Sequence, residues 1–133
     1  MITEKEIVDE CLGVPYKHRG RDLSGWDCWG LIKFIYKDLG YDLWDIEEDY
    51  DENWAWKNRN HFIENYYKEW TKVDKPELFD GVLFKNSKGI ANHGGIVLSN
   101  DRFIHCCKAG TVINRLSDSH WQKRLQGFYR LRK

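Results

Sequence analysis

A cysteine between two tryptophans is the residue in this sequence best placed to do covalent chemistry. Cys28 directly follows Asp27 in the segment 23–36, "LSGWDCWGLIKFIY". The segment predicts a helix that begins at Cys28 with Asp27 as its N-cap, where unpaired backbone N–H groups favour an anion. We therefore expect this position to stabilise a thiolate and to lower the thiol pKa, which would make Cys28 a nucleophile at neutral pH.

Histidine would complete such a site, because its ring can accept the thiol proton and return it during acyl transfer. Of the five histidines, His93 and His105 lie in the strand-rich second half, where a sheet could hold both rings against the helix end. If the two rings act together, they must lie on the same face of that sheet. Their positions meet this condition only if the hairpin between them has an odd-length loop, or a bulge, around residues 99–102.

The other three cysteines are expected to be reduced, structural thiols. Cys11 falls on the apolar face of a predicted helix, and Cys106 and Cys107 are adjacent on a predicted strand, so that one points inward and one outward. Four cysteines spaced in this way do not indicate a disulfide framework. A zinc site made from His93, His105 and the adjacent cysteines is the weaker alternative, because no C-x-x-C pair is present. We expect neither a metal nor a cofactor.

Helical patterns precede strand patterns along the chain. A capping box, T-x-x-E, opens the first helix, and a glycine follows each of the first two helices. After Pro76 the hydrophobic period changes to two, which predicts about five short strands. Helices followed by strands indicate an α+β domain with an antiparallel sheet. The predicted helices are 4–12, 28–39 and 54–70, and the predicted strands are 81–85, 93–99, 102–107, 110–116 and 126–133.

Composition limits the classes of function. A chain of 133 residues has room for one domain with a single core, so residues 1–133 are treated as one unit. Lys plus Arg and Asp plus Glu number 21 each, which argues against nucleic acid or an anionic membrane as partner. The polar first ten residues do not have the pattern of a signal peptide, and no stretch is apolar enough to span a membrane. We therefore expect synthesis in the cytoplasm without an export signal.

Three segments carry a resemblance to a known family. The segment 12–31, "LGVPYKHRGRDLSGWDCWGL", is similar to the cysteine motif of the NlpC/P60 family of papain-like cysteine peptidases, which has the form G-x-P-Y followed by G-x-D-C-x-G-L. The segment 92–106, "NHGGIVLSNDRFIHC", resembles the family's histidine motif, H-x-G-I with a second histidine in the next strand. The segment 110–130 resembles the family's closing strand, W-x-x-R turn and final strand. Only an aromatic-rich insertion at about 44–70 is unmatched.

The resemblance implies a papain-like α+β fold in which N-terminal helices, one with Cys28 at its N-terminus, pack on the antiparallel sheet. Carried over position by position, it makes Cys28 the nucleophile, His93 the general base and acid, and His105 the third member that orients His93. Tyr16 matches the family's tyrosine, whose hydroxyl would lie near the oxyanion beside the backbone N–H of Cys28. The family cleaves bacterial cell-wall stem peptides, typically the bond from D-γ-glutamate to a diamino acid.

Three features depart from the family's pattern. Trp29 follows the nucleophile where many members have serine, and we expect Asp27 and Trp29, which flank Cys28, to lie beside the substrate. The D-C-W-G-L form resembles the branch found in bacteriophage and prophage tail proteins, which would add tail proteins as partners. Asp80 and Gly81 stand in reversed order relative to the family's common G-D pair. The third departure is the insertion, which carries Trp44, Trp54, Trp56 and Trp70. It forms either a groove wall or docking surface, or part of the core.

Three classes of function are consistent with these observations. The first is a thiol hydrolase that cleaves peptidoglycan stem peptides by a Cys-His-His acyl-enzyme mechanism. The second is a thiol amidase or acyl transferase on the same scaffold, and the third is a non-enzymatic module of phage tail assembly that keeps the fold. The retained set of Tyr16, Cys28, His93 and His105 favours the hydrolase. Access to the cell wall would then require lysis, a pore or a tail tip.

Overall fold

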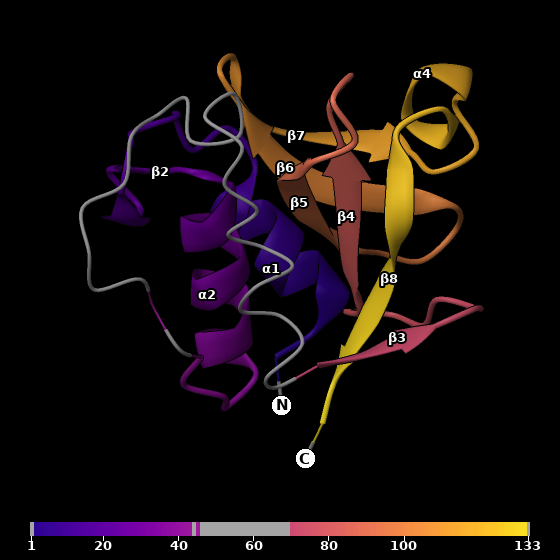
Figure 1. The fold of residues 1–133 in the computed structure, drawn as a ribbon. Coiled ribbons are helices and arrows are strands. Elements are labelled where there is room, and N and C mark those ends of the chain that lie inside the picture. The colour runs from indigo at the N-terminus through magenta and orange to yellow at the C-terminus, as the bar shows by residue number, and fades with distance from the viewer. Residues whose placement is uncertain (1, 44, 46–69, 133) are drawn as a thin grey trace.

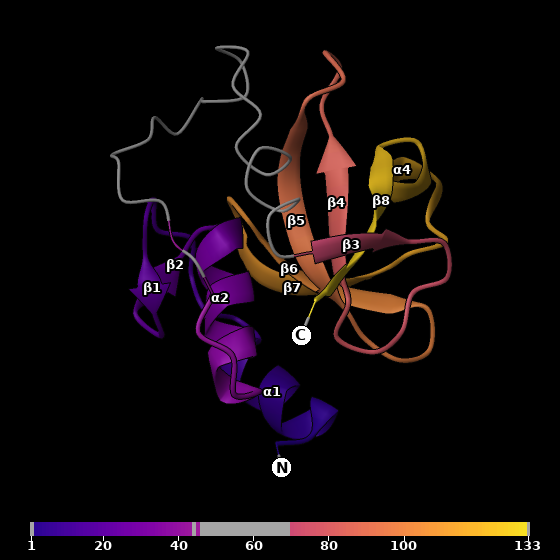
Figure 2. The ribbon, with the colours of Figure 1, turned by 60° about the horizontal axis from the view of Figure 1, so that its bottom comes forward.

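Short helices and a six-stranded antiparallel sheet make up the computed structural model, which describes residues 2–43, 45 and 70–132. α1 and α2 lie on one side of the sheet, and α4 lies at its other side (Figures 1 and 2). This arrangement confirms the α+β class with N-terminal helices. The helices are α1 (Glu4–Cys11), α2 (Cys28–Asp38) and α4 (Ser119–Gln122), and the strands are β1 (Arg21–Asp22), β2 (Gly25–Trp26), β3 (Trp70–Val73), β4 (Gly81–Lys85), β5 (Ala91–Val97), β6 (Arg102–Cys107), β7 (Gly110–Arg115) and β8 (Leu125–Leu131).

Both N-terminal helices begin and end where local sequence signals predict. The backbone N–H of Glu6 donates to Thr3 Oγ1 at 3.2 Å, and that of Thr3 donates to Glu6 Oε1 at 3.3 Å, which completes the capping box of α1. Asp27 caps α2 by accepting from the backbone N–H of Gly30 at 2.9 Å. Gly40, with a φ of +98°, follows α2 and takes a conformation that favours glycine. The predicted N-caps are therefore confirmed.

The sheet has the strand order β3-β8-β4-β5-β6-β7. The five strands predicted after Pro76 are all present, so one strand of this sheet, β3, was not predicted. The short strands β1 and β2, which form a separate two-stranded sheet, were not predicted either. β3 pairs with β8, from Trp70 opposite Leu131 to Val73 opposite Phe128. The prediction that a helix extends to Trp70 is wrong at that residue, because this pairing partner lies far along the chain and leaves no local pattern. The rest of the predicted helix, with Trp44, Trp54 and Trp56, lies outside the described residues.

Each face of the sheet packs against its own set of apolar side chains. Adjacent strand residues point to opposite faces, so Ile96 belongs to the core under α1 and α2, whereas Val97 belongs to a smaller core on the opposite face. The smaller core consists of Val82, Phe84, Val97, Phe103 and Leu116, with Trp121 of α4 packed against it. The helix α2 is thus fixed on one face, and α4 covers part of the other.

The hairpin between β5 and β6 has an odd-length loop, as predicted. Gly95 pairs with His105 and Val97 pairs with Phe103. The backbone N–H of Leu98 donates to the carbonyl of Arg102 at 2.8 Å, which leaves residues 99–101 as the loop. This register places positions 93 and 105 on the same face of the sheet.

The reversed Asp80–Gly81 pair forms a closed turn before β4. The Asp80 carboxylate accepts from the backbone N–H of Glu77 at 2.7 Å and from Nε and Nη2 of Arg130 at 2.9 and 2.8 Å. Asp80 is therefore buried with its charge paired, and Gly81 is free to begin the strand.

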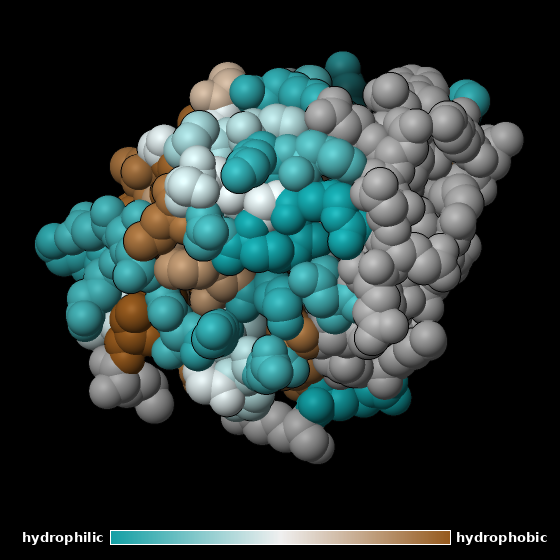
Figure 3. All heavy atoms as spheres, turned by 90° about the vertical axis from the view of Figure 1, so that its left-hand side faces the viewer, coloured by the Kyte–Doolittle hydropathy of each residue, from teal (hydrophilic) through white to brown (hydrophobic). Residues whose placement is uncertain are grey.

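Figure 3 shows the molecule from the left-hand side of Figure 1. Hydrophilic side chains cover most of the described part of this face, and hydrophobic ones form small patches between them. This appearance matches the charged fraction of 32% in the sequence. In the part of the chain that the structure describes, no helix is long and apolar enough to cross a bilayer.

Candidate active site

Cys28 is the first residue of α2, and its half-buried thiol lies against β5. The backbone N–H of Gly94, the residue after His93, is directed at the sulfur, and so is the N–H of Trp29. The fold therefore brings the thiol to the stretch of β5 that carries His93. Among the described residues, the hydrogen bonds of the His93 ring include His105 and not the thiol.

His93, His105 and Asn114 form a continuous chain of hydrogen bonds. His93 Nε2 lies 2.7 Å from His105 Nδ1, and His105 Nε2 lies 2.7 Å from Asn114 Oδ1. An amide oxygen can only accept, so the proton of this second bond belongs to His105 Nε2. His105 Nδ1 then accepts from His93 Nε2, which leaves Nδ1 of His93 as the basic atom of the chain.

Gly95 makes room for this contact between the two rings. It lies directly opposite His105 in the ladder. A Cβ atom on Gly95 would lie 2.7 Å from the carbonyl oxygen of Ile104, a distance that real Cβ atoms essentially never show, and 3.0 Å from Cβ of His105, a contact that is tight enough to require a small shift. Glycine at this position is therefore a geometric requirement of the His93–His105 pair.

An aromatic wall surrounds the two imidazoles on the face opposite α2. Trp121 lies over them from α4, and Phe84 and Phe103 complete the wall. Asp118 holds α4 in place as its N-cap, accepting from the backbone N–H of His120 at 2.9 Å. His105 is buried at this wall, and His93 is partly buried.

Burial sets the charge states of the site. The pKa of His93 is lowered to about 3, first by burial and then by the nearby His105 and Arg124. Burial also lowers the pKa of His105, against the hydrogen bond to Asn114, which raises it. The pKa of the Cys28 thiol is raised to about 12 by burial and by the negative charge of Asp27, and the N–H groups of Gly94 and Trp29 only partly oppose this.

The expectation of a lowered thiol pKa at Cys28 is therefore wrong for the ligand-free site. The helix N-terminus is present as predicted, but the loss of hydration outweighs its N–H groups. The resting site holds a neutral thiol and a neutral imidazole. Cys11 and Cys106 have raised pKa values of about 12 and about 11 for the same reason. All four cysteines are free thiols.

Asp27 and Trp29 make structural contacts. The Asp27 carboxylate accepts from the N–H groups of Gly30 and Arg19, and from Nη1 of Arg21 at 2.9 Å. Trp29 is 8% exposed and belongs to the core under α2. Contact of either residue with a substrate stays a prediction.

Tyr16 lies in the segment that pairs with the residues just before Cys28. It forms an isolated bridge with Trp26, whose carbonyl accepts from the Cys106 thiol at 3.3 Å. Nζ of Lys108 lies 4.4 Å from the centroid of the half-buried Tyr16 ring. The role of the Tyr16 hydroxyl at an oxyanion stays a prediction.

Two site residues escaped the sequence reasoning. Trp121 stands in the W-x-x-R motif but received no role, and Asn114 lies inside a predicted strand without any local signal. Only the register of β6 and β7 could have indicated Asn114, because the pairing of His105 with Val112 puts Asn114 diagonal to His105 on the same face. Within the described ranges, no group of three or more His, Cys, Asp or Glu side chains is placed to hold a metal ion.

Comparison with known proteins places this chain beside cell-wall enzymes. The model of the NlpC/P60 family matches residues 13–130, a range that contains every site residue described above. The chain is 28% identical over 116 residues to the "probable peptidoglycan endopeptidase LytE" of Bacillus subtilis, a match that covers 87% of this chain and 30% of LytE. It is 29% identical over 126 residues to the "murein DD-endopeptidase MepH" of Escherichia coli, covering 90% of this chain and 42% of MepH. The chain thus spans less than half the length of either relative.

Solved structures share the fold. An NLP/P60 family protein described as similar to a lipoprotein, from Staphylococcus aureus, superposes with a TM-score of 0.71 at 22% identity, over 97% of this chain and 40% of that one. The NlpC/p60 domain of the peptidoglycan hydrolase SagA superposes with a TM-score of 0.56 at 22% identity, over 96% of this chain and 97% of that domain. These likenesses confirm the fold predicted from the resemblance. The phage or prophage tail origin stays a prediction.

Proposed function

The chain belongs to the NlpC/P60 family, and on that premise we propose that it is a cysteine peptidase that hydrolyses peptidoglycan stem peptides at the bond from D-γ-glutamate to the diamino acid. The proposal rests mainly on the row of hydrogen bonds that joins His93, His105 and Asn114. The Cys28 thiol lies against Gly94, the residue that follows His93. The names of the relatives LytE and MepH support the substrate class.

The first half-reaction forms an acyl-enzyme. The Cys28 thiol gives its proton to Nδ1 of His93 as its sulfur attacks the scissile carbonyl carbon. The imidazolium that forms keeps its Nε2 proton on His105 Nδ1, which stabilises the new positive charge. The carbonyl oxygen becomes an oxyanion beside the backbone N–H of Cys28, with the Tyr16 hydroxyl as second donor. His93 then protonates the departing amine, and a thioester remains.

The second half-reaction releases the product. A water molecule gives a proton to Nδ1 of His93 and attacks the thioester carbonyl, and His93 returns the proton to the Cys28 sulfur as the C–S bond breaks. Because the thiol and the imidazole are both neutral at rest, the ion pair exists only while a substrate occupies the site. Catalytic hydrogen bonds are often long in a free site and tighten when substrate binds, so we expect the hydrogen bond between the thiol and the imidazole to form in the complex with substrate.

A defined peptide tests the proposal. We would incubate the protein with L-Ala-γ-D-Glu-diamino acid-D-Ala peptides that carry either meso-diaminopimelate or lysine, and follow the products by mass spectrometry. The expected products are L-Ala-D-Glu and the diamino acid dipeptide, formed by wild type and not by Cys28→Ala or His93→Gln. Intact peptide with the wild-type protein at high concentration would contradict the proposal. Formation of a new amide when a free amine is added would indicate the acyl transferase instead.

The same assay should also test the D-Ala to diamino acid cross-link, because the relative MepH is named a DD-endopeptidase. We therefore include a cross-linked stem-peptide dimer, whose cleavage at the D-Ala to diamino acid cross-link would give two monomers. Monomers without L-Ala-D-Glu would move the assignment to the cross-link, with the same nucleophile and base.

A further inference from the structure

We propose that Asn114 is a positioning residue that determines which nitrogen of His93 is basic. The inference rests on the proposed function, because it concerns the general base of that reaction. Asn114 does not touch the thiol, and it acts through His105, whose Nε2 lies 2.7 Å from its Oδ1.

The edge strand β7 holds Asn114 at a fixed distance from His105. At the start of the strand, Thr111 exchanges backbone hydrogen bonds with the segment before Cys28, accepting from Gly13 at 3.0 Å and donating to Val14 at 2.9 Å. Just beyond its end, the N–H of Leu116 donates to the carbonyl of Asp101 at 2.8 Å. Asn114 lies between these two anchors, so its amide is presented to His105 by backbone that is tied down on both sides.

Two proton arrangements are open to a pair of neutral imidazoles joined by one hydrogen bond. In the first, His93 Nε2 donates to His105 Nδ1 and Nδ1 of His93 is basic. In the second, His105 Nδ1 donates, His93 Nε2 accepts, and Nδ1 of His93 carries a proton that makes it useless as a base. An acceptor at His105 Nε2 permits only the first arrangement. The Asn114 oxygen is that acceptor.

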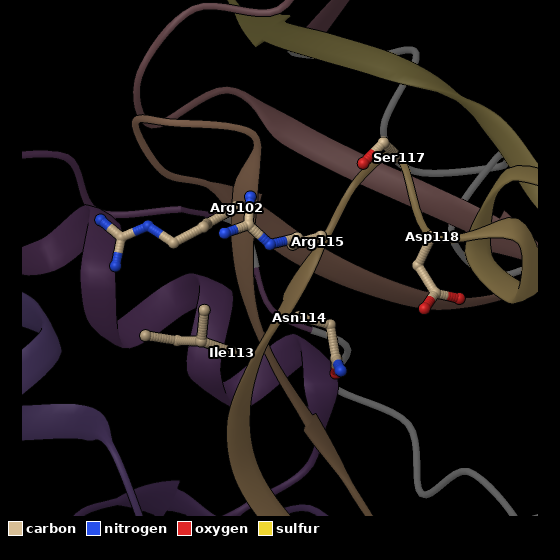
Figure 4. Close-up of a pocket in the computed structure, with 6 residues that line it drawn as sticks. All are labelled: Arg102, Ile113, Asn114, Arg115, Ser117 and Asp118. Carbon is tan, nitrogen blue, oxygen red and sulfur yellow. The ribbon is translucent and has the colours of Figure 1, made fainter.

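The position of Asn114 allows a decisive substitution. Its side chain is half-buried and lines a pocket of about 370 Å³, together with Arg102, Ile113, Arg115, Ser117 and Asp118. In Figure 4 the Asn114 amide points away from the two arginines. Because the pocket reaches the surface, a carboxylate at position 114 would remain hydrated and would keep the shape of the amide. An aspartate side chain at this position can only accept a hydrogen bond, and an alanine side chain can neither accept nor donate one.

The experiment compares Asn114→Ala, Asn114→Asp and the control Arg115→Ala, which changes the exposed next residue of β7. The first readout is the ¹⁵N spectrum of the histidine rings in the free protein, which reports the protonated nitrogen of each ring. The second is the pH profile of kcat with the stem peptide. Thermal unfolding confirms that each variant is folded.

We expect wild type, Asn114→Asp and Arg115→Ala to show His105 protonated at Nε2, and Asn114→Ala to show a mixture of the two forms. For Asn114→Ala, kcat should fall about tenfold at constant KM, since losing one such hydrogen bond has about this effect on a rate. Asn114→Asp should retain kcat within about threefold. Its acid limb should move to higher pH, because the carboxylate stabilises the protonated rings.

Two results would overturn the inference. One is a folded Asn114→Ala protein with the wild-type tautomer and kcat. The other is a folded Asn114→Asp protein as impaired as Asn114→Ala, which would mean that the amide matters as a donor or as packing. The ring spectra need no substrate, so they test the role of Asn114 even if no stem peptide is cleaved. Absence of cleavage by the wild-type protein would count against the proposed function alone.

Discussion

Trp121 lies nearly parallel to His93, with 5.7 Å between the ring centroids and an interplanar angle of 23°. The same indole meets the His105 ring edge-on, at 4.8 Å and 78°. One side chain from α4 therefore covers both imidazoles, on the face of the sheet that carries the smaller core. Burial is the largest cause of the low pKa of His93, and the Trp121 ring contributes to that burial.

Replacing Trp121 should move the acid limb of the activity profile. Trp121→Ala exposes His93 to water, so its pKa rises from about 3 toward the ordinary value of 6.5, and the basic form is lost at a higher pH. Removal of the half-buried indole should also lower the free energy of unfolding by about 2–3 kcal/mol. The measurement is kcat/KM against pH from 3 to 8. Trp121→Phe should restore most of the profile, and an unchanged acid limb in a folded Trp121→Ala protein would contradict this account.

The lowered pKa of His93 should also make the fold less stable in acid. The folded pKa of His93, about 3, lies below its ordinary value of 6.5, so the unfolded chain binds more protons between these pH values. This contribution to stability is fully present above about pH 6.5 and is lost as the pH falls toward 3. Urea unfolding at pH 7.5, 5.5 and 4 should show a steeper loss for wild type than for His93→Gln. Equal slopes in the two proteins would show that His93 has the same pKa in the folded and unfolded states, which would contradict its lowered pKa in the fold.

The contact between the histidine rings depends on a missing side chain at residue 95. Gly95→Ala places a methyl group 2.7 Å from the Ile104 carbonyl and 3.0 Å from Cβ of His105, so the strands must separate. We expect a loss of about 3 kcal/mol and of nearly all activity. The control is Gly40→Ala, where nothing lies within 4 Å of the added atom and only the φ of +98° is unfavourable. That variant should cost about 1 kcal/mol and leave kcat unchanged.

Local signals in the sequence were sufficient for much of this architecture. The caps at Thr3 and Asp27 each depend on a few neighbouring residues, and the loop parity follows from the alternation of side chains along a strand. The strand at Trp70 was missed because β8, its partner, comes about sixty residues later. The contact of Asn114 with His105 likewise depends on register between strands, which residue types alone do not specify.

The direction of the shift in the Cys28 thiol pKa could not be predicted from neighbouring residues either. A helix N-terminus at Cys28 can be predicted from the neighbouring residues, and its effect on an anion is favourable. Desolvation depends on which distant segments cover the sulfur, here the Gly94 region of β5, and it has the opposite sign and the larger size. Sequence reasoning therefore identified the residue and the stabilising groups but not the balance between them.

Removing the charge of Asp27 should make Cys28 more reactive. The Asp27 carboxylate is the second cause of the raised thiol pKa, after burial. Asp27→Asn keeps an oxygen that can cap α2 but removes the negative charge, so the thiol pKa should fall and more thiolate should form at a given pH. The rate of Cys28 alkylation by iodoacetamide at pH 8 should rise, with Cys11 as the buried reference thiol in the same molecule.

The pH dependence of this alkylation distinguishes the causes. Because the wild-type thiol pKa is about 12, its alkylation rate should still be rising between pH 8 and pH 10. A wild-type plateau below pH 8 would instead mean that the free enzyme already holds a thiolate, paired with protonated His93. A comparison of two variants separates the charge of Asp27 from its role as N-cap, because Asp27→Asn removes only the charge and Asp27→Ala removes both. Asp27→Ala should therefore destabilise the protein by about 1–2 kcal/mol more than Asp27→Asn does. A slower Asp27→Asn reaction in the folded protein would show that Asp27 activates the thiol.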